Sequence, residues 1–79
     1  MSDGRLRWQC KRGMRELDEL LARYLDNAYQ RAPEAEKLAF HELLQVPDPD
    51  LIRYLLGGQV HASPQIADVI ETIRSRPQA

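Results

Sequence analysis

Side chains of both charges surround a glycine near the start of the chain, in residues 8–18, which read WQCKRGMRELD. Gly13 has no side chain, so its backbone can adopt conformations closed to other residues and can approach another surface closely. Arg12 and Glu16 flank it, one turn apart if a helix begins near the glycine. Arg15 is spaced to meet both Asp18 and Glu19 on that helix. We therefore predict that this segment docks on another molecule.

Enzyme chemistry would need a nucleophile beside a base, or paired carboxylates in a pocket. Glu16 and Asp18 are two residues apart, so they would point in different directions on a helix, and a solvated charged face explains them better. Ser63 precedes a proline and is interpreted as a helix cap rather than a nucleophile. The sequence therefore predicts no catalytic residue and a protein that is not an enzyme.

The single cysteine, Cys10, excludes an internal disulfide and leaves a zinc site short of thiolates. His41 and His61 are too far apart for ligand spacing, so each is interpreted as a surface or helix-end imidazole. We predict no metal site and no stably bound cofactor. No apolar run suits a membrane span or a signal peptide, so we expect a reducing cytoplasm and no membrane insertion. We also expect a monomer.

Nucleic-acid binding stays open as an alternative, because four basic residues and one aromatic residue precede Gly13: Arg5, Arg7, Trp8, Lys11 and Arg12. A cation-rich helix start also suits phosphate, although one glycine is neither a dinucleotide fingerprint nor a phosphate loop. The net charge of -1 argues against a polyanion site, because nucleic-acid modules usually carry a net positive charge. We therefore favour a protein partner and expect no nucleic acid.

The 79 residues suffice for one domain, 1–79, with a thin core. We predict an all-α fold, a compact bundle of about five short helices, after a loose start at residues 2–4. The helices are expected at residues 5–11, 14–30, 33–45, 49–56 and from 64 to about 76. The clearest apolar stripe lies in the second and comprises Leu17, Leu20, Leu21, Tyr24, Leu25 and Ala28.

Proline, glycine and short polar residues predict the helix ends. Pro33 suits a first helical position, and Asp48 suits a cap with Pro49 following it. The two glycines at residues 57–58 are typical of a helix end at which a glycine adopts the left-handed conformation. Trp8 is interpreted as a core or edge-of-core residue, with a partner contact as the alternative.

Residues 8–18, with their core RGMRELD, resemble the signature of the small FAD assembly factors of succinate dehydrogenase and fumarate reductase. Leu43-Leu44, the run DPDL at 48–51 and Tyr54-Leu55 before a glycine resemble that family's second conserved block in order and spacing. The resemblance spans residues 5–74. Lys11 stands where many relatives have arginine, which keeps the charge but loses bidentate geometry, and Tyr54 replaces a frequent tryptophan.

The resemblance implies a chaperone that binds the flavoprotein subunit and promotes covalent attachment of FAD to a histidine of that subunit. It implies a five-helix fold and no FAD held stably by the helper, and it leaves open a direct FAD carrier. It also implies that the Arg12-Gly13-x-x-Glu16 face lies on the flavoprotein near its flavin. The expected partner-binding residues are Arg12, Gly13, Glu16, Trp8, Lys11, Met14, Arg15 and Asp18.

Overall fold

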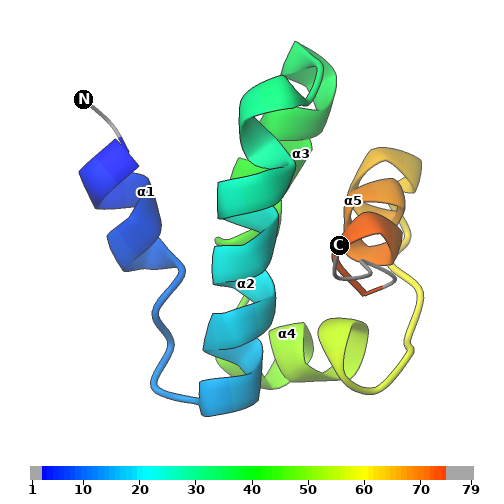
Figure 1. Ribbon diagram of the computed structural model, residues 1–79. Helices are drawn as coiled ribbons and strands as arrows, with labels where there is room; N and C mark the ends of the chain where they lie inside the picture. The colour runs from blue at the N-terminus through cyan, green and yellow to red at the C-terminus, as the bar shows by residue number, and fades with distance from the viewer. Residues whose placement is uncertain (1–2, 75–79) are drawn as a thin grey trace.

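The computed structural model describes residues 3–74, and within them the chain forms five α-helices, one short 3-10 helix and no strand. Figure 1 shows the second helix running through the centre, with the first on one side, the last on the other, and the fourth crossing beneath. The predicted all-α fold of about five short helices is confirmed. The elements are α1 (Asp3–Gln9), α2 (Arg15–Asn27), η1 (Tyr29–Arg31), α3 (Glu34–Leu43), α4 (Asp48–Leu55) and α5 (Pro64–Arg74).

The core forms where apolar stripes of α2, α3 and α5 face one another. Such stripes arise because side chains three and four residues apart share one face of a helix. Helix α5 packs against both α3 and α2. Complete burial of one large aliphatic or aromatic side chain is worth about 1.5–3 kcal/mol. The side chains with no more than 1% exposure in these helices are Leu17, Leu21, Phe40, Leu43, Val69 and Ile73.

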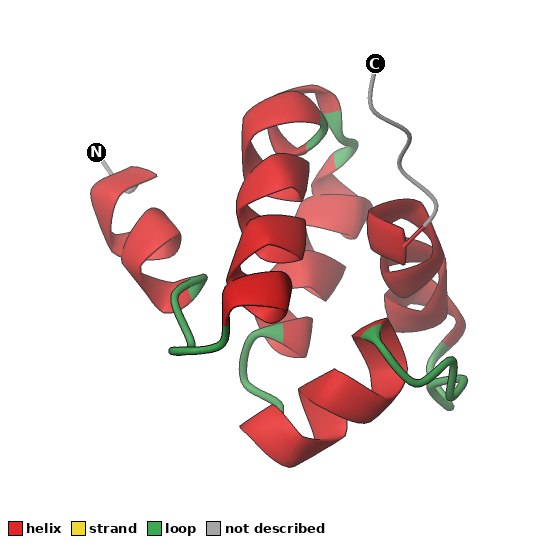
Figure 2. Ribbon diagram, turned by 60° about the horizontal axis from the view of Figure 1, so that its bottom comes forward, coloured by secondary structure: helices red, strands yellow, loops and turns green. Residues whose placement is uncertain are grey.

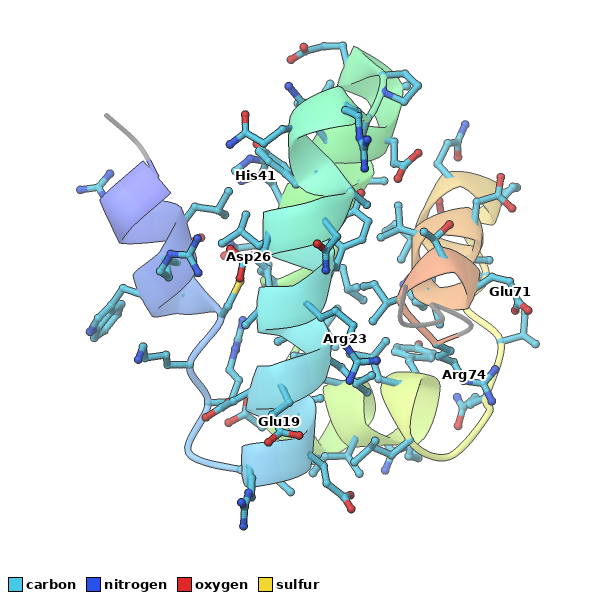
Figure 3. The ribbon with its side chains drawn as sticks, viewed as in Figure 1. Glu19, Arg23, Asp26, His41, Glu71 and Arg74 are labelled. Carbon is cyan, nitrogen blue, oxygen red and sulfur yellow. The ribbon has the colours of Figure 1, made fainter. Side chains whose placement is uncertain are left out.

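Helices α1 and α4 close the two remaining sides of this core. Leu51 and Leu55 of α4 are buried, as are Leu6 of α1 and Cys10 just after it. The views in Figures 1 and 2 both place α1 beside α2, joined to it only by an extended loop. An exposed ion pair between Arg7 and Asp26, 2.6 Å long, links the two helices, and Figure 3 shows Asp26 on the side of α2 that faces α1.

An aromatic cluster joins the end of α2 to α3. The rings of Tyr24 and Phe40 lie 4.6 Å apart between centroids. The Tyr24 hydroxyl donates a 2.7 Å hydrogen bond to Glu36, and burial together with this bond raises the pKa of Tyr24. Tyr29 and His41 form a 2.8 Å hydrogen bond between the hydroxyl and Nε2. The second helix, predicted over residues 14–30, ends at Asn27 in the structure. The short helix η1 follows and places the Tyr29 ring in this aromatic cluster.

Several predicted helix ends are wrong by a few residues. Asp3 and Gly4, expected in a loose start, belong to α1, and Ser2 lies outside the described residues. Pro33 is the N-cap of α3 rather than its first residue. Helix α3 ends at Leu43 rather than Gln45, and the predicted end of the last helix at residues 75–76 lies outside the described residues.

Both ends of α4 show what decides these boundaries. Asp48 is the first residue of α4 and Pro47 is the N-cap, so the predicted capping role of Asp48 is wrong. At the other end, Gly58 has a φ of +81°, which confirms the left-handed glycine. The neighbouring Gly57 has no room for a side chain, because a Cβ there would lie 2.9 Å from the Arg53 carbonyl oxygen.

Candidate docking site

Gly13 lies in the loop between α1 and α2 and has a φ of +85°. Side-chain-bearing residues rarely adopt this left-handed conformation, which accounts for glycine at this position. The residue is exposed, and a Cβ built on it would meet no atom within 4 Å. The loop therefore presents bare backbone to the surroundings, in a gap that the described part of the chain leaves open.

Arg12 turns inward instead of outward. Its side chain is 16% exposed, its Nη1 donates to Asp48 Oδ1 at 3.1 Å, and its Nη2 donates to the Leu44 carbonyl oxygen at 2.5 Å. The contact of Arg12 with a partner stays a prediction, and in this structure the guanidinium bonds to residues of its own chain. The physical reason is that α2 begins only at Arg15, which leaves Arg12 in the preceding loop and directed toward the α3–α4 junction.

Of the two contacts that helical spacing predicts for Arg15, the one with Glu19 is confirmed, because the two side chains pair at 3.6 Å across an exposed surface. Asp18 makes a different contact. Its carboxylate accepts a 2.6 Å hydrogen bond from the backbone N–H of Arg12 and so ties α2 to the loop before it. Asp18 is half-buried, and its role in this structure is to shape the loop.

The remaining predicted residues, Glu16, Lys11, Met14 and Trp8, are exposed. Glu16 is in the first turn of α2, and no ion pair or hydrogen bond within residues 3–74 involves its carboxylate. Lys11 is also exposed, and Met14 is 37% exposed. Trp8 is 73% exposed, so the prediction of a core position is wrong. Leu6 forms the buried face of α1, and a residue two positions away points elsewhere on a helix.

Sequence reasoning missed a hollow that adjoins Glu16. It measures about 280 Å³ and lies between the first turns of α2 and Leu56, the residue that follows α4. Two apolar side chains line it, and Figure 3 shows Glu19 and Arg23 along the same face of α2. The lining residues are Glu16, Glu19, Leu20, Arg23 and Leu56. Leu56 is 39% exposed although its apolar pattern indicates burial, because it shares a helix face with the half-buried Ile52, four residues earlier, rather than with the buried Leu51 and Leu55.

The described residues contain no cluster of histidine, cysteine and carboxylate side chains that could hold a metal ion. Burial raises the pKa of Cys10 to about 11, against an ordinary 9.0, so this thiol is protonated at neutral pH. No helix among residues 3–74 combines the length and the apolar character that crossing a bilayer requires.

Comparison with known proteins agrees with the resemblance in the sequence. Residues 4–77 match the profile of a family described as flavinator of succinate dehydrogenase. The chain belongs to this family. The flavinator family is one of assembly factors, not of catalytic enzymes, and its profile covers the loop of residues 10–14 and, apart from Asp3, all five helices.

Relatives in the flavinator family align over nearly the whole chain, and each is named FAD assembly factor SdhE. The protein of Shewanella oneidensis is 38% identical over 76 residues, which cover 96% of this chain and 93% of that protein. The protein of Methylococcus capsulatus is 44% identical over 72 residues, covering 91% and 87%. That of Coxiella burnetii is 37% identical over 78 residues, covering 99% and 92%. No solved structure gave a significant match.

Proposed function

We propose that this chain binds the flavoprotein subunit of succinate dehydrogenase and promotes the covalent attachment of FAD to a histidine of that subunit. The fumarate reductase flavoprotein is a second client in this proposal. The chain acts as a monomer in the cytoplasm and needs no nucleic acid. FAD becomes joined to the client and is not held stably by the helper. Membership of the flavinator family supports the client and the reaction.

The observation that carries the docking surface is the open left-handed glycine beside a free carboxylate. Gly13 lets a partner approach the backbone, and Glu16 has no partner among residues 3–74 to give up on binding. Trp8 and Met14 add exposed apolar surface, and tryptophan and methionine are enriched where proteins meet. Lys11 adds a positive charge. Arg12 and Asp18 contribute to docking through the internal hydrogen bonds that hold the loop before α2. Arg15 contributes a surface charge paired with Glu19.

The mechanism that fits these residues is positioning. Correct alignment of reacting groups can supply about 7–11 kcal/mol of a barrier in the best intramolecular cases. Docking of the surface formed by Gly13, Glu16, Trp8, Met14 and Lys11 would bias the flavoprotein toward the arrangement in which its histidine meets the flavin methyl group. In this proposal the helper contributes no acid, base or nucleophile.

Glu16→Ala tests this proposal, with Glu34→Ala as its control. Both glutamates are exposed and lie in the first turn of a helix, so the loss of each charge affects its helix dipole similarly. Each variant is mixed with the apo flavoprotein subunit and FAD, and covalent flavin is followed by fluorescence in a denaturing gel. We expect Glu16→Ala to slow attachment about tenfold, a loss of about 1.4 kcal/mol, while Glu34→Ala matches the parent.

Equal attachment rates in the two variants would contradict the role of Glu16. Circular dichroism of both proteins establishes that the comparison is between folded chains.

A further inference from the structure

Leu44 and Asp48, at the α3–α4 junction, accept hydrogen bonds from Arg12 although they are far from it in sequence. Arg12 lies in the loop of residues 10–14, which carries Gly13 and is called the docking loop below. We propose that Asp48 is a positioning residue of the docking site, because its carboxylate clamps Arg12 and so fixes the conformation in which Gly13 is presented. This inference rests on the proposed function. It gives the start of α4 a part in docking that requires no contact between Asp48 and the client.

The clamp fixes Arg12 at three points. Its backbone N–H donates to Asp18 of α2, its Nη1 donates to Asp48 of α4, and its Nη2 donates to the carbonyl of Leu44, just after α3. The three acceptors come from three segments that meet only in the folded chain. Because Arg12 directly precedes Gly13, these bonds restrict the backbone from which the left-handed turn begins.

Burial makes the guanidinium dependent on these acceptors. The Arg12 side chain is 16% exposed, and its Nε is buried without a hydrogen-bond partner among the described residues. A buried charge is stable only where paired groups replace the lost water, and charge-assisted hydrogen bonds are the stronger ones. Asp48 is the only carboxylate within residues 3–74 that is bonded to this guanidinium. Without the Asp48 carboxylate, water solvates the guanidinium better than the protein does. The Arg12 side chain should then turn toward solvent and displace the docking loop.

A loop that is fixed before binding has less freedom to lose when the client arrives, and preorganisation of this kind increases affinity. Asp48 should therefore affect docking without affecting the bundle. The core side chains of α4, Leu51 and Leu55, are buried, and neither residue accepts a hydrogen bond from Arg12. Asp50 offers a matched control, since it lies in the same helical turn with the same charge and pairs with Arg53 of α4 itself.

The experiment compares Asp48→Ala, Asp50→Ala and Asp48→Glu with the parent chain. Hydrogen exchange of the Arg12 amide is measured in each isolated chain, and affinity for the purified apo flavoprotein subunit of succinate dehydrogenase is measured by calorimetry. We expect Asp48→Ala to speed Arg12 exchange and to weaken docking about tenfold, whereas Asp50→Ala changes neither. Asp48→Glu restores a carboxylate and should recover part of the affinity, while Asp50→Ala shows what the loss of an acid from the first turn of α4 does by itself.

Parent-like exchange or parent-like affinity in Asp48→Ala would overturn the inference. Equal weakening by Asp50→Ala would also overturn it, because the effect would then belong to the helix start in general. Failure of the proposed function has a different signature, since the parent chain would itself show no binding to the subunit. In that case Asp48 would have no docking site to position, whatever the Arg12 exchange rate.

Discussion

Gly13→Leu should separate docking from folding, because the fold contains a second glycine in the same backbone conformation. Gly13 has a φ of +85° and Gly58 a φ of +81°. A Cβ at Gly13 meets nothing within 4 Å, and at Gly58 the nearest atom is Arg74 Nη2 at 3.7 Å, an ordinary contact. Neither substitution causes a clash with the backbone, so each should cost only the left-handed strain of about 1–2 kcal/mol.

This cost is too small to unfold the chain at 25 °C. Domains of this length are stable by roughly 4–12 kcal/mol, since stability is about 0.05–0.15 kcal/mol per residue. For a domain of 60–100 residues, 1 kcal/mol lowers the Tm by about 4–8 °C. We therefore expect similar falls in Tm for Gly13→Leu and Gly58→Leu, both measured by circular dichroism.

The two variants should differ in flavin attachment. In the reconstitution with the apo flavoprotein subunit and FAD, Gly13→Leu places a side chain where the client approaches the backbone. Its attachment rate should fall by more than about tenfold, equivalent to about 1.4 kcal/mol, while Gly58→Leu should stay within about twofold of the parent. Equal rates in the two variants, at equal folded fractions, would refute the argument that the open gap at Gly13 receives the client.

Two further predictions concern the scaffold. Leu43 is completely buried, so Leu43→Ala should lower the free energy of unfolding by about 2–5 kcal/mol in urea titrations. Leu38 is 57% exposed, so Leu38→Ala should cost less than about 0.5 kcal/mol. Similar urea midpoints for the two variants would contradict the position of the core. Burial raises the pKa of Cys10 to about 11, so its thiol should react slowly with a disulfide reagent at pH 8 in the folded chain and rapidly in urea. Because the folded pKa lies above the ordinary 9.0, the unfolded chain loses this proton first, and stability should decline as the pH rises from about 9 to 11; Cys10→Ala should lack that contribution.

The exposed position of Trp8 shows where reasoning from residue type fails. Leu6 and Cys10 are spaced four residues apart, which predicts a shared face, and both are buried. Trp8 is midway between them and therefore on another face of α1, although its size favours a core position. Spacing is the better guide, because the geometry of the helix decides which side chains can reach the core together.

The sequence by itself determined the helices, most of the buried stripes and the need for a left-handed glycine after α4. These features follow from local physics: side-chain period, proline geometry and the φ values that a Cβ forbids. The family signature in residues 8–18 is also a local run of residue types, so the sequence alone contains it, and the family profile confirms it.

Only the tertiary structure decided what the charged residues of the signature contact. Arg12 and Asp48 are 36 positions apart, so no local pattern could show that they form an ion pair. Nor could it show that Glu16 lies without an ion pair to residues 3–74, beside a hollow completed by Leu56. A polar side chain bonds to whatever the packing of the helices brings within about 3 Å, and that packing depends on the apolar faces of the whole chain.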